Sequence, residues 1–288
     1  MKYYGKVYRP PSEANSLIIQ CTIGCAFNTC TFCSMYKEDS FTVRKKDDII
    51  ADLEECVQYV PEIEKIFLAD GDAMVLPTDT LIDIITKSYN LYPKLKSVNI
   101  YATVKDILKK SEKDLSDLKN AGLVMVYIGL ESGSDKIIKK VKKNQTQEEF
   151  VLAVKKLKKI GIKSSVTLIF GLGEYEDSEE HILESAKAVS LSKPDFVSFL
   201  SLYLEPGAPL YDAEREGKFT MIDDMKILEE MEMFIKSVDS EGTIFRSNHA
   251  SNPVAIKGTF NRDRNDMLNQ ISYAKSRSLF RPKSYRAL

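Results

Sequence analysis

The order of apolar runs is the feature that most constrains the fold of this 288-residue chain. Short apolar runs alternate with longer amphipathic stretches. The strands predicted from the short runs span residues 17–21, 63–69, 97–102, 124–130, 164–170 and 196–202. The predicted helices span roughly residues 46–59, 79–92, 111–120, 146–160, 178–191 and 223–238. Strands that alternate with helices of this length predict a parallel sheet, because each return to a parallel strand needs a crossover.

Six strand-plus-helix units, without the signature of a dinucleotide-binding fold, favour an α/β fold of one particular kind. We expect an open, partial (β/α)6 barrel of the TIM type. A doubly wound sheet is the nearest alternative, and periodicity does not separate the two. We expect residues 1–205 to form the core barrel, and residues 206–288 to form a C-terminal helix and an extension that packs on it.

Composition and charge narrow the class of protein. The chain is 43% hydrophobic and 29% charged, with 41 Lys and Arg against 42 Asp and Glu. A net charge of -1 argues against a protein that generally coats nucleic acid. No apolar run approaches the roughly 18–20 residues of a membrane span, and the N-terminus lacks the apolar stretch of a signal peptide. These observations predict a cytoplasmic protein that does not bind a membrane.

Four of the five cysteines lie within thirteen residues, and this cluster predicts a metal site. They are Cys21, Cys25, Cys30 and Cys33, whereas Cys56 lies apart on a predicted amphipathic helix. In a reducing compartment such a cluster favours a metal over disulfides, and thiolates select zinc or iron–sulfur. A zinc site would use all four cysteines or recruit His181 or His249. Three cysteines with a vacant fourth iron suit a [4Fe–4S] cluster.

The cysteine loop resembles that of the radical S-adenosylmethionine (SAM) superfamily. In that family three cysteines hold a [4Fe–4S] cluster whose unique iron chelates SAM, most often with the spacing C-x3-C-x2-C and an aromatic residue before the last cysteine. Here Cys30, Phe32 and Cys33 form that ending, and Cys25 gives the spacing C-x4-C-x2-C. The resemblance therefore implies Cys25, Cys30 and Cys33 as ligands, with Cys21 as the rival for the first position. The loop is similar to a branch related to anaerobic coproporphyrinogen oxidase and Elongator-like enzymes.

Motifs at later strand ends extend this resemblance. Asp70, Gly71 and Asp72 follow the second strand and resemble the Gly-Gly-Glu motif, which in the family meets the methionyl ammonium of SAM. Glu131 and Ser132 follow the fourth strand and are similar to a segment that contacts the ribose or the ammonium. The alternatives are an ordinary Asp-Gly turn at the first motif and a helix start at the second.

A third motif follows the fifth strand. Ile169, Gly171 and Glu174 match the Ile-x-Gly-x-x-Glu part of the family's G-x-I-x-G-x-x-E motif, which lies against the adenine, and Thr167 replaces its first glycine. The order of these motifs at successive strand ends makes the resemblance specific. It covers roughly residues 16–205.

The resemblance implies an enzyme with a [4Fe–4S] cluster and SAM as cofactors. Reductive cleavage of SAM would give methionine and a 5′-deoxyadenosyl radical that abstracts hydrogen from a substrate. A one-electron donor of the flavodoxin or ferredoxin type would be the partner. The substrate is not written in these motifs, and a small molecule or a tetrapyrrole is favoured. The alternatives are an RNA- or protein-modifying enzyme with a basic tail after Arg262, and a non-enzymatic zinc or iron–sulfur binding module.

Candidate substrate-binding residues lie past the predicted barrel, where a polar stretch contains Arg246, Asn248, His249 and Asn252. Their donors could bind carboxylates or phosphates. For a small-molecule substrate we expect Arg246, Arg281 and Arg286 to converge as a carboxylate-binding set. His181 and the lysines of residues 136–143 are expected on solvated helix faces.

Overall fold

The computed structural model describes residues 1 and 3–286, and contacts divide the chain into two compact units. The first unit comprises Met1–Asn28, Met35–Ile128 and Lys156–Ser164, and the second comprises Thr29–Ser34, Gly129–Lys155 and Ser165–Leu288. The chain crosses between them twice in the cysteine loop, inside two strands and inside one helix. These units do not divide the chain at residue 205. The boundary expected there, between a core barrel and a C-terminal extension, stays a prediction.

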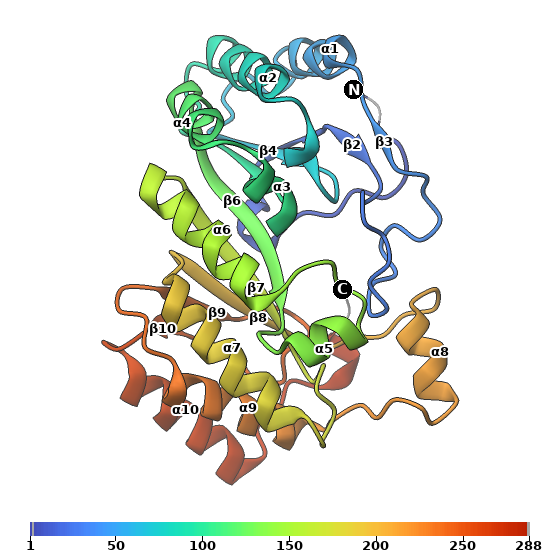
Figure 1. The fold of residues 1–288 in the computed structure, drawn as a ribbon, viewed down its shortest axis with the longest axis vertical. Coiled ribbons are helices and arrows are strands. Elements are labelled where there is room, and N and C mark those ends of the chain that lie inside the picture. The colour runs from blue at the N-terminus through green and yellow to red at the C-terminus, as the bar shows by residue number, and fades with distance from the viewer. Residues whose placement is uncertain (2, 287–288) are drawn as a thin grey trace. The chain divides into compact units, whose positions relative to one another are not determined.

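Four parallel strands form the sheet of the first unit. They are ordered β1 (Leu17–Gln20), β4 (Lys65–Ala69), β5 (Ser97–Tyr101) and β6 (Leu123–Glu131), and β6 continues into the second unit. A small antiparallel pair, β2 (Thr22–Ile23) and β3 (Thr42–Val43), follows β1. The helices of this unit are α1 (Lys46–Cys56), α2 (Thr78–Leu91), α3 (Val104–Lys109) and α4 (Glu112–Ala121). Figure 1 shows α1, α2 and α4 together on one side of β4.

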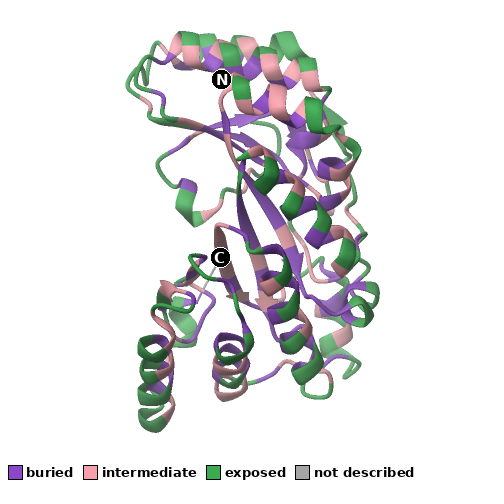
Figure 2. Ribbon diagram, turned by 60° about the vertical axis from the view of Figure 1, so that its left-hand side comes forward, coloured by how far each residue is buried: buried purple, intermediate pink, exposed green. Residues whose placement is uncertain are grey.

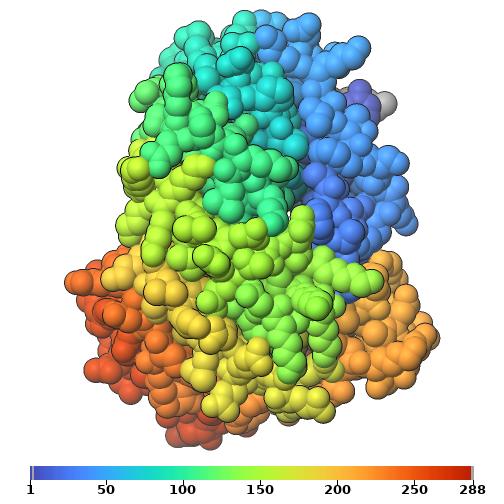
Figure 3. Space-filling view, viewed as in Figure 1, coloured from blue at the N-terminus to red at the C-terminus, as the bar shows by residue number. Residues whose placement is uncertain are grey.

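The second unit also alternates parallel strands with helices, and it ends with an antiparallel strand and a helix. Strands β7 (Lys163–Phe170), β8 (Phe196–Ser201) and β9 (Ile244–Ser247) are parallel, and β10 (Ile256–Thr259) pairs antiparallel with β9. Its helices are α5 (Asp135–Lys140), α6 (Gln147–Ile160), α7 (Ser178–Ser192), α8 (Pro209–Arg215), α9 (Asp224–Ser237) and α10 (Arg264–Arg277). Helix α10, orange-red in Figure 3, lies at the surface of this unit.

Each unit has its own apolar core, and Figure 2 shows strands that are largely buried beneath helices with one exposed face. In the first unit Phe67 makes edge-to-face contacts with Tyr101 and Tyr127, at centroid distances of 4.7 and 5.4 Å. In the second unit Phe170 stacks on Phe199 at 4.0 Å, and Phe234 meets Phe199 edge-on at 4.7 Å. Such contacts give each unit an apolar interior of close-packed rings.

The predicted α/β class is confirmed. All six predicted strands and all six predicted helices are present, with ends that differ by at most three residues. The sequence analysis missed β9 and β10, which are four residues each, and the short helices α3, α5 and α8. It also treated α10 as part of an extension, because only Met267, Ile271 and Ala274 of that helix are buried. Among the described residues, no helix combines the length and the hydropathy that a bilayer span needs.

The stacked pair in the second unit gives a stability prediction. Phe199 has no exposed surface, so Phe199→Ala removes a buried ring and leaves a cavity. We expect the free energy of unfolding in urea to fall by about 3–5 kcal/mol. Tyr273→Ala on α10, where the ring is 61% exposed, is the control and should change it by about 0.5 kcal/mol or less. Equal losses in the two variants would contradict this description of the core.

Candidate cofactor site

Cys21 lies in an environment that does not suit a metal ligand. It follows β1, has no exposed surface, and its thiol lies 3.7 Å from the carbonyl oxygen of Ile19. Burial raises the pKa of this thiol to about 12. Since a metal ligand must be a thiolate, this observation favours Cys25 over Cys21 as the first ligand.

Cys25, Cys30 and Cys33 are each partly exposed. The segment that carries the last two is held by main-chain hydrogen bonds in the second unit. The N–H of Thr31 donates to the carbonyl of Val141 at 3.0 Å, and the N–H of Leu210 donates to the carbonyl of Thr31 at 2.9 Å. Within residues 1 and 3–286, no three His, Cys, Asp or Glu side chains are grouped closely enough to hold a metal ion. The ligand set therefore stays a prediction.

Phe32 and Ile169 contact the same apolar cluster of the second unit. The cluster consists of buried residues from α5 and the residue after it, from α8, from the turns after β7 and β8, and from the segment between α8 and α9: Ile137, Val141, Leu172, Leu202, Leu210 and Phe219. Both Phe32 and Ile169 are partly buried against it. The structure therefore brings together two residues that the sequence analysis assigned to cofactor binding from motifs far apart in the chain.

The main chain at Gly71 lies directly against the cysteine loop in the first unit. A Cβ at Gly71 would lie 2.8 Å from the Cβ of Cys25 and 3.1 Å from the carbonyl oxygen of Gly24. Any other residue at position 71 would force one of these main-chain segments to move. The first predicted ligand and the Asp70–Asp72 turn thus form one compact group, and this close approach fits a cluster bound beside an exposed main chain.

Asp70 supplies a buried negative charge to this group. Its carboxylate accepts hydrogen bonds from Nε2 of Gln20 at 2.6 Å and from the hydroxyl of Tyr36 at 3.2 Å. Burial raises the pKa of Asp70 to about 6, and these two hydrogen bonds oppose the rise. Asp70 is therefore mainly ionised at neutral pH. Because both donors are neutral, its charge is available to a cation such as an ammonium group.

Asp72 points toward the next strand end in the first unit. Its Oδ1 accepts from the N–H of Thr103 at 3.4 Å, and its carboxyl group lies beside that of Asp106 on α3. Burial, followed by the neighbouring carboxyl group, raises the pKa of Asp72 to about 8. The pair therefore shares one proton at neutral pH. This geometry ties the turn after β4 to the turn after β5.

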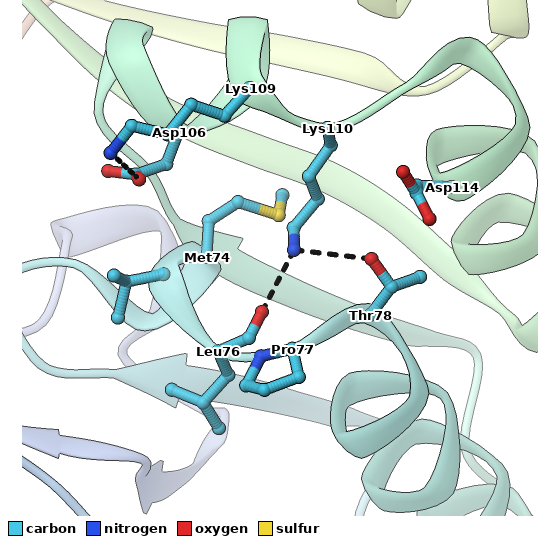
Figure 4. A pocket seen from close by; sticks show the side chains of 9 residues that line it. Met74, Leu76, Pro77, Thr78, Asp106, Lys109, Lys110 and Asp114 are labelled. Atoms are coloured by element: carbon cyan, nitrogen blue, oxygen red, sulfur yellow. Dashed lines mark hydrogen bonds and ion pairs between the residues drawn. The ribbon is translucent and has the colours of Figure 1, made fainter.

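An open pocket of about 270 Å³ is lined by Asp106, Lys109 and Lys110, among other residues (Figure 4). Lys109 pairs with Asp106 at 3.0 Å. Lys110 donates to the carbonyl of Leu76 at 2.8 Å and to the hydroxyl of Thr78 at 3.4 Å. Both lysines that line the pocket thus bond to groups of the protein.

Glu131 has a left-handed backbone, with φ of 62°, and its carboxylate folds back over Gly129. Its Oε1 pairs with Nζ of Lys143 at 3.0 Å. The Glu131 side chain is 11% exposed and the Lys143 side chain 18%. The expectation that every lysine of residues 136–143 is solvated was therefore wrong for Lys143, because this lysine turns inward to the carboxylate.

Ser132 hydrogen-bonds to a histidine that the sequence analysis misplaced. His181 was expected on a solvated helix face, but it is fully buried in the second unit. Its Nδ1 lies 2.8 Å from the hydroxyl of Ser132, and its Nε2 lies 2.9 Å from the carbonyl oxygen of Ile169. Burial lowers the pKa of His181 to about 4, so the ring is neutral at physiological pH.

Gly171 and Glu174 both contact residues of the second unit. Gly171 has φ of 88°, and its N–H donates to Oε2 of Glu230 at 2.8 Å. The carboxylate of Glu174 pairs with Lys140 and accepts from the N–H of Thr220 at 2.8 Å. Glu174 therefore fastens the turn after β7 to the rest of the unit.

The candidate substrate-binding residues differ in the hydrogen bonds that they form within the protein. Asn252 is fully buried and bonds to Ser201, to the Phe199 carbonyl and to Ser247, so its contacts are all internal. Asn248 is exposed, and Arg246 donates only to the carbonyl of Phe245 among the bonds described. The ring of His249 accepts at Nδ1 from the N–H of Ser251 at 3.2 Å. Its role, like those of Arg246 and Asn248, stays a prediction.

Comparison with known proteins decides the family. A family model described as the radical SAM superfamily matches residues 19–186, which is more than half of the chain. The chain belongs to the radical SAM superfamily. It is an enzyme of that superfamily, whose members use a [4Fe–4S] cluster and SAM as cofactors.

Curated relatives match part of their own length. The chain is 30% identical over 194 residues to the biotin synthase of Sulfurihydrogenibium sp. (strain YO3AOP1), covering 67% of this chain and 54% of that protein. It is 24% identical over 193 residues to the heme chaperone HemW of Buchnera aphidicola subsp. Schizaphis graminum, covering 63% of this chain and 49% of that protein. The chain thus spans about half the length of these relatives.

A solved structure confirms the predicted partial barrel. The coproporphyrinogen III oxidase HemN from Escherichia coli superposes with a TM-score of 0.58 at 18% identity, covering 77% of this chain and 52% of HemN. At this identity the likeness concerns the fold. The α/β architecture with mainly parallel strands is thus that of the radical SAM enzymes.

The Asp72–Asp106 pair predicts a pH dependence of stability. The pKa of Asp72 is raised from 3.8 to about 8 in the folded chain, so the folded state holds a proton that the unfolded state releases. The resulting stability is fully present below about pH 4 and is lost as pH rises through about 8. Asp72→Asn donates an N–H at every pH. We therefore expect its free energy of unfolding to fall less than that of the parent protein between about pH 6 and about pH 9.

Asp83→Asn is the matched control, because the Asp83 side chain is half exposed and pairs with Lys46. Urea unfolding of the three proteins across this pH range measures the effect. If Asp72→Asn and Asp83→Asn follow the same pH profile as the parent protein, the shared proton is excluded.

Proposed function

We propose that this enzyme cleaves SAM reductively to a 5′-deoxyadenosyl radical that abstracts hydrogen from a small molecule or a tetrapyrrole. The observation that best supports the cleavage of SAM is the contact of the Gly71 main chain with Cys25, beside the buried charge of Asp70. In the proposal Cys25, Cys30 and Cys33 hold the cluster.

A bound cluster would supply the electron for reductive cleavage of SAM to methionine and a 5′-deoxyadenosyl radical, and hydrogen abstraction from the substrate would follow. The residues of this chain position the cofactor. In the proposal the Asp70 carboxylate and the Gly71 carbonyl accept from the methionyl ammonium, and Glu131 and Ser132 meet the ribose. Phe32 and Ile169 form an apolar wall for the adenine and exclude water.

Contacts of the basic tail favour a small substrate over a nucleic acid. Most cations after residue 261 already bond within the protein. The ion pairs are Arg262 with Asp263, Lys275 with Glu232 and Arg286 with Asp224. Cations engaged in this way have less to offer a phosphate backbone.

The expected set of three converging arginines was wrong. Arg286 forms a bidentate pair with Asp224, and Arg281 donates to the carbonyls of His249 and Ala250. The third arginine, Arg246, donates only to the carbonyl of its neighbour Phe245 among the bonds described. We therefore propose a substrate site around Arg246, Asn248 and His249, with Asn252 as an internal support.

His249 is the donor we assign to the substrate. Because Nδ1 accepts from the N–H of Ser251, the neutral ring carries its proton on Nε2. Burial, followed by the charge of Arg281, lowers the pKa of His249, so the ring stays neutral in the physiological range.

A flavodoxin- or ferredoxin-type protein is the proposed electron donor, and a cytoplasmic location stays a prediction.

A cleavage assay tests the proposal. The protein is reconstituted anaerobically with iron and sulfide, reduced with dithionite and mixed with SAM, and 5′-deoxyadenosine is quantified. We expect product in the parent protein and a decrease of at least about 100-fold in the double variant Cys30→Ala, Cys33→Ala, because two of three thiolates are lost.

Cys56→Ala is the control, since Cys56 lies on α1 outside the loop, and it should retain the activity of the parent protein. Product formation in the double variant at the parent rate would contradict the proposed ligands. Stoichiometric zinc with no SAM binding would contradict the proposed reaction itself.

A further inference from the structure

We propose that His181 and Glu230 are positioning residues that fix the main chain of Ile169–Gly171, which is the end of β7 and the first residue of the turn that follows it, so that this segment, the β7 turn, presents a rigid edge to the nucleoside of SAM. The inference rests on the proposed function for the role of the turn. Neither residue belongs to a motif of the sequence analysis.

His181 holds the first residue of the turn. The carbonyl of Ile169 can only accept, so Nε2 of His181 donates to it across 2.9 Å. The neutral ring then accepts at Nδ1 from the hydroxyl of Ser132, at 2.8 Å. One imidazole therefore joins the turn after β7 to the segment after β6, and both segments carry predicted cofactor contacts.

Glu230 holds the last residue of the turn. It lies on α9, beyond the residues that the family model matches, and it has no exposed surface. Its Oε2 accepts from the N–H of Gly171 and its Oε1 accepts from the hydroxyl of Ser178, both at 2.8 Å. The carboxyl group therefore bridges the turn to the start of α7.

The two side chains reach the turn from adjacent helices. Helices α7 and α9 pack side by side in the second unit (Figure 1). Their core-facing positions would otherwise hold apolar residues, since a buried titratable group without partners is costly. Each of these groups instead makes one hydrogen bond to the same three-residue segment and one to a serine hydroxyl, and such bonds restrict movement of the main chain.

Close packing around the turn adds to this constraint. A Cβ at Gly173 would lie 2.7 Å from the carbonyl oxygen of Asp177 and 3.0 Å from the Cβ of His181. The N–H of Gly133 donates to the hydroxyl of Ser185 at 2.8 Å, one helical turn after His181. A displacement of Ile169–Gly171 by about 1 Å would strain the bonds to His181 and Glu230, and a displacement of that size is enough to impair a positioned cofactor.

Hydrogen exchange and SAM affinity together test the proposal on the full chain. Exchange of the amides of residues 168–173 is measured by mass spectrometry without cofactor. SAM affinity is measured by calorimetry on the anaerobically reconstituted protein. We expect Glu230→Leu and His181→Phe to speed exchange of this segment at least about tenfold and to weaken SAM binding at least about tenfold.

Three further variants keep the test informative. Glu230→Gln can still accept from Gly171 and donate to Ser178, so it should restore both readouts to within about threefold of the parent protein. Glu229→Leu, at the exposed neighbouring position on α9, is the matched control and should change neither. Should Glu230→Leu fail to fold, Ser178→Ala removes one partner of Glu230 and is expected to give a smaller effect of the same sign.

The outcomes separate this inference from the proposed function. If the parent protein binds and cleaves SAM while Glu230→Leu and His181→Phe match Glu229→Leu in exchange and affinity, the positioning role is overturned and the proposed function stands. If the parent protein binds no SAM, both are overturned. Faster exchange with weaker SAM binding, restored by Glu230→Gln, supports the proposal.

Discussion

Parallel pairing of neighbouring strands is the constraint on which the candidate site depends. Strands β1, β4, β5 and β6 run parallel in the first unit, and β7, β8 and β9 do so in the second. Because each strand must be followed by a crossover, the carboxyl ends of the strands in each unit meet at one edge. The residues after those ends are therefore neighbours in space although they lie 30 or more positions apart in the chain. This is why Asp70 lies next to Gln20, and Asp72 next to Thr103.

Buried titratable groups then fix the turns that carry the predicted cofactor contacts. Asp70 is held by Gln20 and Tyr36, and Asp72 shares a proton with Asp106. Burial removes each group from water, and hydrogen bonds to a turn or to a neighbouring strand end compensate for that loss. In the second unit His181 and Glu230 have the same relation to the turn after β7. The turns are thus set by polar bonds that only the folded arrangement can satisfy.

The fold could be predicted from the sequence because local periodicity and the crossover rule act together. Strand β4, predicted over residues 63–69, is present at Lys65–Ala69. The missed elements β9 and α3 are shorter than the window in which periodicity is visible. The cofactors could be predicted too, since the spacing of the cysteines is a local signal of the family.

The partners of the motif residues could not be predicted, because they come from distant segments. Lys143 resembles the other lysines of its stretch, and nothing in its neighbours indicates an ion pair with Glu131. His181 was assigned by its acidic neighbours in sequence, whereas its own side chain faces the core. Glu230 did carry a signal: it lies on the same helix face as Ile227 and Phe234, both buried, and a lone carboxylate on an apolar face indicates an internal partner.

The identity of the cluster ligands is the central claim, and electron paramagnetic resonance of the reduced, anaerobically reconstituted protein tests it most directly. We expect the parent protein and Cys21→Ala to give the signal of a reduced [4Fe–4S] cluster that changes when SAM is added, because Cys21 is buried and protonated. We expect Cys25→Ala to lose that response. A SAM-sensitive signal that persists in Cys25→Ala and disappears in Cys21→Ala would contradict the assignment.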